Sequence, residues 1–152
     1  MSETFVSRDT PQAGAAGPRF GLSKSKISAF EQCAKKLWLS RHRPELAEVD
    51  SGAEARFDAG HVVGMIACRL QGSGVMVEAE PDLAAAVATT RALMEEDATR
   101  PIFEATFEHD NVLVRVDVLE PTAHGWLIAE VKSSAGVKDY HLGDLATQVW
   151  VL

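Results

Sequence analysis

The chain has little cysteine and no long apolar run. Its two cysteines lie far apart in the sequence, so they do not form the disulfide framework of a small secreted protein. No stretch is apolar over the length that a membrane-spanning helix requires, and no signal-peptide pattern is present. These absences predict a protein of a reducing, cytoplasmic environment with no membrane segment.

Positive charge is also scarce. Lysine and arginine number 15 against 22 aspartates and glutamates, which gives a formal net charge of -7. The protein is therefore not a bulk polycation, and any contact with nucleic acid must come from a local basic patch. A length of 152 residues is enough for one domain with a single core.

The most informative stretch is residues 112–132, which predicts a β-hairpin. Two runs rich in β-branched residues flank a break at residues 121–125, where Pro, Thr, His and Gly occur. Asp117 lies inside the first run, and Glu130 and Lys132 close the second. Because successive strand side chains point to opposite faces, Glu130 and Lys132 share a face and Val131 points away. Antiparallel pairing then places Asp117 across from them.

These charged residues have two interpretations. Charges in an apolar sheet are unfavourable unless they are paired or bind a metal ion. The simpler interpretation is a surface ion pair in which Lys132 answers Glu130. The alternative is a site for a hard divalent cation, because Mg²⁺ and Mn²⁺ prefer carboxylate oxygens. Lys132 would then orient or deprotonate a water molecule, or stabilise charge on a phosphate.

The order of these motifs resembles a known nuclease superfamily. Asp117, then Glu130-Val131-Lys132, then Gln148 on a following helix is similar to the PD-(D/E)XK nucleases. The nearest similarity is to their RecB-like branch, which is related to the exonucleases of CRISPR adaptation. Residues 22–46 resemble the first helix of an uncharacterised RecB-like bacterial family, which opens with Ser-Lys-Ser, a Cys and Lys-x-Leu-Trp-Leu. The resemblance runs from about residue 22 to the C-terminus.

The resemblance implies an α+β (α/β), restriction-endonuclease-like fold. Such a core has N-terminal helices, a three-stranded antiparallel stretch, a following helix and a final strand. Since the chain stops inside that helix, we expect the final strand to be missing and the single domain over residues 20–152 to be incomplete at its C-terminus. Residues 1–19, rich in Ser, Thr, Gly, Ala and Pro, predict a disordered tail.

The resemblance also implies site roles. Asp117, Glu130 and the Val131 carbonyl would hold Mg²⁺ or Mn²⁺, Lys132 would activate the attacking water, and Gln148 would position the water or a phosphate. RecB-like nucleases often carry a further histidine ligand on the second helix, for which His61 is the candidate; a packing histidine is the alternative. Ser133 follows the Glu-x-Lys motif, where a hydroxyl contact with the nucleic acid is expected, and a simple loop is the alternative.

Residues 23–43 predict the first helix, with Ser23 or Ser25 as its cap. One face is basic, and we consider it either a solvated surface or a contact for a phosphate backbone. The basic residues are Lys24, Lys26, Lys35, Lys36, Arg41 and Arg43.

Cys33 lies within this helix. In iron–sulfur members of the RecB-like group an N-terminal cysteine joins three others near the C-terminus, and a cluster needs about four thiolates. This chain offers only Cys33 and Cys68, so no iron–sulfur cluster is expected. Cys33 is predicted to be a small buried residue, and a ligand role in a longer parent protein is the alternative.

The remaining elements support the site. Helices are predicted over residues 53–70, 81–97 and 144–152, and strands over 75–77 and 101–108. Gly60 and Gly64 are spaced for close packing of the second helix against a neighbour, and their cost in a helix suggests either a packing or a site reason. Glu104 is either an outward polar residue or an acid near the metal edge. Leu145, Val149 and Leu152 are expected to face inward.

The sequence therefore favours a metal-dependent nuclease that hydrolyses phosphodiester bonds, with DNA as the expected substrate and RNA as the alternative. No base-reading motif is present, so no sequence specificity is predicted. The alternative is a catalytically silent nuclease-fold module that binds nucleic acid or a protein partner. An open sheet edge would be the surface for a protein partner or for a longer parent chain.

Overall fold

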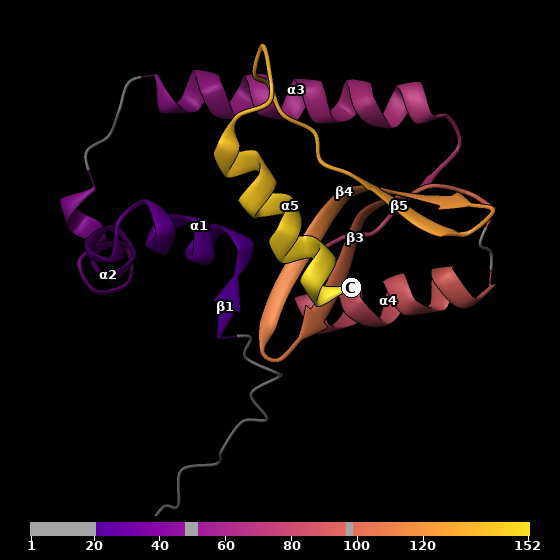
Figure 1. The fold of residues 1–152 in the computed structure, drawn as a ribbon, viewed down its shortest axis with the longest axis horizontal. Helices are drawn as coiled ribbons and strands as arrows, with labels where there is room; N and C mark the ends of the chain where they lie inside the picture. Colours follow the sequence, from indigo (N-terminus) through magenta and orange to yellow (C-terminus); the bar gives the residue numbers. More distant parts are fainter. Residues whose placement is uncertain (1–20, 48–51, 97–98) are drawn as a thin grey trace, which may run out of the picture.

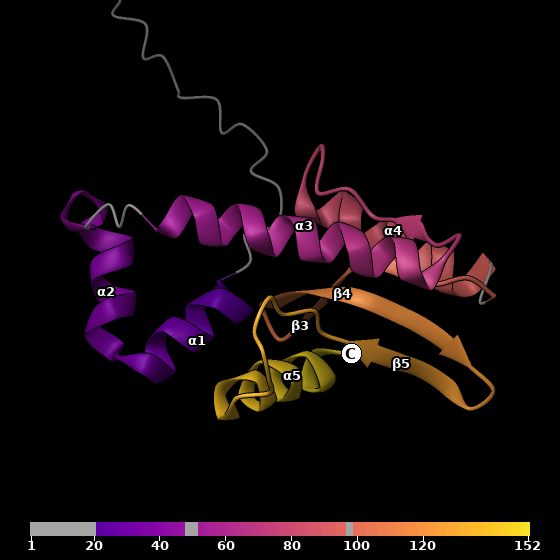
Figure 2. The same cartoon turned by 90° about the horizontal axis from the view of Figure 1, so that it is seen from above.

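The computed structural model describes residues 21–47, 52–96 and 99–152. The tail predicted over residues 1–19 lies outside these ranges. The described residues form an α+β protein in which helices lie on both faces of a five-stranded mixed sheet (Figures 1 and 2). The predicted fold class is confirmed.

Three antiparallel strands make the centre of the sheet. They are β3 (Ile102–His109), β4 (Val112–Thr122) and β5 (Gly125–Ala129), and β4 pairs with both of the others. The predicted hairpin is therefore confirmed. Within the described ranges, the outer edge of β5 has no partner strand.

Two short strands complete the sheet in parallel orientation. β1 (Leu22–Ser23) lies beside the start of β4, and β2 (Val75–Met76) lies beside the start of β3. β1 is absent from the sequence prediction because a two-residue strand has no periodicity to detect. Its pairing attaches the helix that follows, beginning at Lys24, to the start of β4.

A tight turn joins β3 to β4. Asp110 and Asn111 occupy the left-handed region with φ of 46° and 64°, which is the geometry of a two-residue hairpin turn. Asp and Asn tolerate this region better than most residues. The Asn111 side chain also accepts a hydrogen bond from the Gly21 N–H at 2.8 Å, and this bond ties the entry to β1 to the turn.

The predicted helix over residues 23–43 is two helices. α1 (Lys24–Gln32) and α2 (Ala34–His42) are separated by Cys33, whose φ of -171° and ψ of 118° are those of extended backbone. A short 3-10 helix (Pro44–Leu46) follows. The prediction of a buried Cys33 is wrong, because this residue lies exposed at the break. The axes of α1 and α2 diverge (Figure 2), so their basic residues do not share one continuous helix face.

Three further helices flank the sheet: α3 (Ala53–Gln71), α4 (Leu83–Glu96) and α5 (Asp139–Val151). α5 covers one face of the sheet, and α3 runs across the other (Figure 2). α5 begins five residues before the predicted start at Asp144. Within the described ranges, no helix combines the length and apolar character that crossing a bilayer requires.

The core lies between α4 and the centre of the sheet. Its fully buried members are Val77, Ala86, Ile102, Ala105, Val116 and Leu119. A second cluster joins α5 to β4 through Val151, Val112 and Val114. Thr90 of α4 is buried with Thr106 of β3, and its hydroxyl accepts a hydrogen bond from the Thr106 N–H at 2.8 Å. This contact satisfies a buried main-chain donor.

Two packing predictions are wrong. A Cβ added at Gly60 or Gly64 would meet nothing within 4 Å, so these glycines do not mediate close packing; both line a cleft beneath α3. Val149 and Leu152 are 60% and 45% exposed, and the inward face of α5 instead carries Gln148 and Val151. Gln148, a polar residue, thus occupies part of the inward face that was expected to be apolar, and it donates a hydrogen bond to Glu130.

Candidate functional site

Asp117 lies on β4 at the point where the hairpin partner leaves the sheet. The register pairs Val118 with Ala129, so Glu130 follows directly across from Asp117. The Val131 N–H donates to Asp117 Oδ2 at 2.6 Å. The Asp117 carboxylate therefore holds the chain in extended form just beyond β5 and fixes the direction in which Glu130 and Lys132 point.

Glu130 points to the α5 side of the sheet and accepts three hydrogen bonds. Lys132 Nζ and Lys24 Nζ both donate to Oε1 at 2.6 Å, and Gln148 Nε2 donates to Oε2 at 2.7 Å. The Glu130 side chain is 9% exposed. The prediction that Glu130 and Lys132 share one face is confirmed.

Lys132 is held by two carboxylates. Besides Glu130 it donates to Asp144 Oδ2 on α5 at 3.2 Å. Burial acts to lower the pKa of Lys132, but the charges of Glu130 and Asp144 outweigh it and raise that pKa above its usual value. Burial likewise acts to raise the pKa of Glu130, but hydrogen bonds from Lys132, Lys24 and Gln148 leave it below its usual value. Glu130 and Lys132 are thus a charged pair at neutral pH.

Gln148 is fully buried on α5. Its Nε2 is committed to Glu130, while its Oε1 has no hydrogen-bond partner among the described residues. Burying an amide oxygen without a partner is unfavourable. The residue is retained in a core position where an apolar side chain would pack, and its visible contact is the one that orients Glu130.

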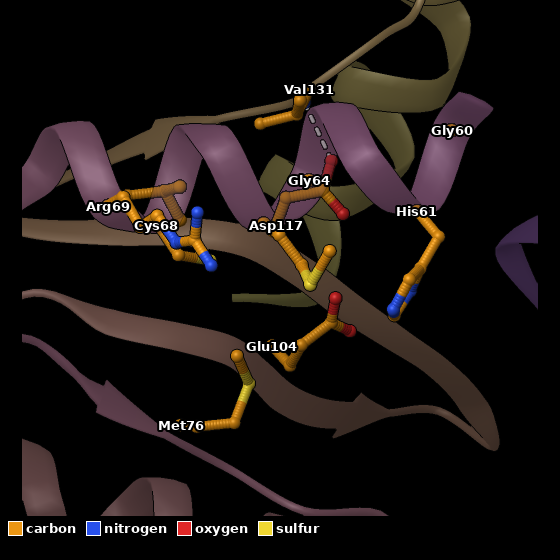
Figure 3. A pocket seen from close by; sticks show the side chains of 11 residues that line it. Gly60, His61, Gly64, Cys68, Arg69, Met76, Glu104, Asp117 and Val131 are labelled. Carbon is orange, nitrogen blue, oxygen red and sulfur yellow. Dashed lines mark hydrogen bonds between the residues drawn. The ribbon is translucent and has the colours of Figure 1, made fainter. Parts of the chain in front are cut away.

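The opposite side of the hairpin forms a cleft of about 380 Å³ beneath α3. Asp117, Val131, His61, Cys68 and Glu104 line it, and Figure 3 shows the His61 ring and the Glu104 carboxylate in the same cleft as Asp117. Asp117 and Glu130 therefore lie beside each other where the pairing of β4 with β5 stops, but they line different hollows. Glu130 and Lys132 line a second hollow together with Ser134, His141 and other residues of the α5 side.

Negative charge is crowded around Asp117. Burial raises the pKa of its carboxyl; the hydrogen bond from Val131 partly offsets this, and the charge of Glu130 raises the pKa further. The charge of Lys24 acts to lower this pKa, and the charge of Glu104 raises it. Burial and the charge of Glu104 also raise the pKa of the Cys68 thiol, so this thiol is not activated toward thiolate chemistry.

Glu104 reaches the cleft through an unusual backbone conformation. Its φ of 55° is in the left-handed region, within an otherwise regular strand, and such a conformation is unfavourable for a residue with a side chain. Arg115 of β4 forms an ion pair with it at 3.1 Å (Nε to Oε2). Of the two interpretations of Glu104, its place in the cleft favours the acid beside Asp117.

The strand end offers carboxylate and carbonyl oxygens, which are the donor types that hard divalent cations prefer. Asp117 and Glu130 flank the Val131 main chain, and like-charge repulsion at Asp117 is what a cation would relieve. In the part of the chain that the structure describes, no three His, Cys, Asp or Glu side chains lie close enough together to hold a metal ion. A site of two carboxylates completed by a carbonyl and water, which Mg²⁺ accepts, is compatible with that arrangement. His61 lines the cleft with Asp117 but makes no contact that settles its role.

The predicted nucleic-acid contacts are dispersed. Lys26 donates to the Gly21 carbonyl at 2.9 Å, and Lys36 donates to Gln32 at 2.6 Å. Arg43 is paired with Glu45. Ser133 is exposed beside Lys132, and the exposed basic side chains of α2 include Lys35 and Arg41. Lys24 differs from all of them, because it points into the site.

Sequence reasoning missed Asp144 as a site residue, and it assigned Lys24 to a phosphate contact and did not foresee its bond to Glu130. Asp144 had a signal, since it lies four residues before Gln148 and hence on the same helix face. Lys24 had none, because its contact with Glu130 spans 106 residues and depends on the pairing of β1 with β4.

Comparisons with family models, with curated proteins and with solved structures found no match to this chain.

Proposed function

We propose that this chain is a metal-dependent nuclease domain of the PD-(D/E)XK, RecB-like type that hydrolyses phosphodiester bonds of DNA without sequence specificity. The observation that carries the proposal is the arrangement at one strand end. Glu130 and Lys132 are hydrogen-bonded on one face, Gln148 of α5 holds Glu130, and Asp117 lies opposite across the hairpin. A simple surface ion pair between Glu130 and Lys132 would not require the fully buried Gln148 that holds Glu130.

In this proposal Asp117, Glu130 and the Val131 carbonyl hold Mg²⁺ or Mn²⁺. The bound ion supplies charge stabilisation at the phosphate and a more acidic water. Lys132 donates hydrogen bonds to two carboxylates, so it acts as an ammonium that orients the nucleophile or stabilises phosphate charge. This geometry favours an electrostatic role for Lys132 over proton abstraction.

Gln148 has a narrower role than the resemblance implies. Its donor group is committed to Glu130 at 2.7 Å, so it positions that carboxylate. It does not reach out to a phosphate. His61 remains a proposed additional ligand from α3, on the Asp117 side of the site. A cytoplasmic location is also part of the proposal, because Cys33 and Cys68 are both free thiols.

The test is cleavage of labelled single- and double-stranded DNA, with RNA in parallel, in Mn²⁺ or Mg²⁺ and in EDTA. We expect metal-dependent cleavage by the wild type and a loss of about 100-fold or more for Asp117→Asn and Glu130→Gln. Glu120→Gln is the matched control, since Glu120 lies on the same strand and pairs with Leu127 outside the site. Metal-independent cleavage, or equal loss in the control, would contradict the proposal.

A second candidate is a catalytically silent module of the same fold that binds DNA. It is favoured by one observation: both oxygens of Glu130 already accept hydrogen bonds from Lys24, Lys132 and Gln148. Such a module would bind DNA in EDTA through the exposed basic side chains of α2, which include Lys35 and Arg41. Binding in EDTA without cleavage in any metal would favour this candidate.

A further inference from the structure

Lys24 belongs to the N-terminal part of the described chain and contacts Glu130 across 106 residues of sequence. It is the first residue of α1, and its Nζ lies 2.6 Å from Glu130 Oε1. The Lys24 side chain is 22% exposed and that of Glu130 9%, so the ion pair is largely withdrawn from solvent. The other lysine at this oxygen is Lys132, also at 2.6 Å.

Main-chain pairing fixes the position of Lys24. Leu22 and Ser23 form β1 and lie opposite Val112 and Leu113 of β4. The Leu22 N–H donates to the Asn111 carbonyl at 3.1 Å, and α1 begins immediately after β1. The helix that carries Lys24 is thus attached to the strand that carries Asp117, and Lys24 does not meet Glu130 by chance at a loose surface.

The two lysines on Glu130 are not equivalent. Lys132 has a second carboxylate, Asp144, at 3.2 Å, and would stay anchored without Glu130. Lys24 has one acceptor in the described ranges, Glu130. A cation that competes for Glu130 Oε1 therefore displaces Lys24 more readily than Lys132.

We propose that Lys24 is a displaceable counter-ion of the site: it neutralises Glu130 in the metal-free protein, yields Glu130 Oε1 to the divalent cation, and is then free to bind a phosphate of the substrate. This inference rests on the proposed function. It accounts for two observations together. First, both oxygens of Glu130, which is assigned to metal binding, already accept hydrogen bonds. Second, Lys24 of α1 points into the site, whereas Lys26 of the same helix donates to the Gly21 carbonyl just before β1.

The first experiment measures thermal stability of the wild type, Lys24→Met and Lys26→Met as a function of MnCl₂ concentration. Methionine keeps most of the side-chain stem and removes the charge. A ligand that binds only the folded state raises the melting temperature. We expect the Mn²⁺ midpoint of Lys24→Met to be about tenfold lower than that of the wild type, since a unit charge close to the ion is removed. Lys26→Met should match the wild type.

The outcomes separate the inference from the proposed function. If Mn²⁺ stabilises the wild type and the Lys24→Met midpoint is equal or higher, the inference is overturned and the metal site stands. If Mn²⁺ stabilises Lys24→Met alone, Lys24 blocks the site and does not yield Glu130 to the cation, so displacement is overturned while the metal site stands. If Mn²⁺ stabilises none of the three proteins, both the inference and the proposed metal site are overturned.

A second variant, Lys24→Gln, replaces Lys24→Met if that protein does not fold. Glutamine keeps a hydrogen-bond donor for Glu130 and removes the charge. The second readout is DNA binding in EDTA and in Ca²⁺ by the otherwise wild-type protein, with both carboxylates of the site intact. We expect removal of Lys24 to weaken binding about threefold or more in Ca²⁺ and to leave it unchanged in EDTA. Equal weakening in both buffers would mean a permanent phosphate contact and would overturn displacement.

Discussion

The two carboxylates of the site should respond oppositely to neutralisation. Glu130→Gln removes a charge that two ammonium groups and one amide stabilise, whereas Asp117→Asn removes a charge that burial and neighbouring acids disfavour. We therefore expect Glu130→Gln to lower the free energy of unfolding at pH 7 without metal. Asp117→Asn should leave it unchanged or raise it.

The magnitude follows from the contacts. A hydrogen bond to a charged group contributes about 1.5–3 kcal/mol, but Lys24 and Lys132 are 22% and 31% exposed and rehydrate when released. Discounting for that exposure leaves roughly 0.5–1 kcal/mol for each lysine. Weakening of the Gln148 bond adds about 0.5–1 kcal/mol. The total for Glu130→Gln is about 2 kcal/mol, which lowers Tm by about 4–8 °C in a protein of this size.

Asp117→Asn keeps its main structural contact. An asparagine oxygen still accepts the Val131 N–H that Asp117 Oδ2 accepts at 2.6 Å. Removing the charge relieves repulsion from Glu130 and Glu104. The expected change is between zero and about 1 kcal/mol of added stability.

The pH dependence has opposite signs for the two acids. The folded-state pKa of Glu130 is lowered, so its stabilisation is complete above the ordinary glutamate pKa of about 4.3 and is lost as the pH falls through the folded value. The folded-state pKa of Asp117 is raised, so its ionised form destabilises the protein above that folded value. This effect disappears below the ordinary aspartate pKa of about 3.9.

Urea unfolding followed by circular dichroism in EDTA, at pH 7 and at pH 4 and below, measures both differences. At pH 7 Glu130→Gln should be less stable than the wild type and Asp117→Asn equally or more stable, and both differences should shrink in acid. Glu120→Gln, on the same strand, is the control for loss of a carboxylate outside the site. Equal destabilisation by Asp117→Asn and Glu130→Gln at pH 7 would refute the reasoning.

Three further predictions concern stability. Gln148→Met should change it by less than about 1 kcal/mol, because the lost bond is offset by removal of the unpartnered Oε1, yet it should lower cleavage; a large loss of stability would contradict this. Thr90→Val should cost about 1–3 kcal/mol by leaving the Thr106 N–H unpaired, with Thr90→Ser as the control that restores the acceptor. Asn111→Ala should cost about 1–2 kcal/mol in urea unfolding, since alanine tolerates the positive φ poorly and cannot bond Gly21, and a neutral result would refute that account.

Local patterns predicted the part of the site that lies on the hairpin. A period of two residues fixes the shared face of Glu130 and Lys132, and the turn chemistry at Asp110 and Asn111 fixes the preceding hairpin. Gln148 came from the resemblance, and the structure brings it to Glu130. These features depend on residues close in sequence or on a single helix.

Features that depend on distant contacts were not predictable in the same way. The break at Cys33 has no Gly or Pro to announce it, and the left-handed Glu104 lies in a strand of ordinary composition. The inward contact of Lys24 depends on β1, which is too short to show a pattern. Helix composition correctly placed α3, but it could not show that Phe57 and Leu70 remain more than 80% exposed.

The pairing of Lys24 with Glu130 has a consequence for biosynthesis. The contact joins residues 106 positions apart, and Gln148 reaches the same carboxylate from α5. High contact order delays the formation of such contacts in folding. The full set of contacts to Glu130 therefore requires residues 139–151 to have emerged from the ribosome, and a nascent chain that exposes the hairpin alone carries its acidic residues without Gln148.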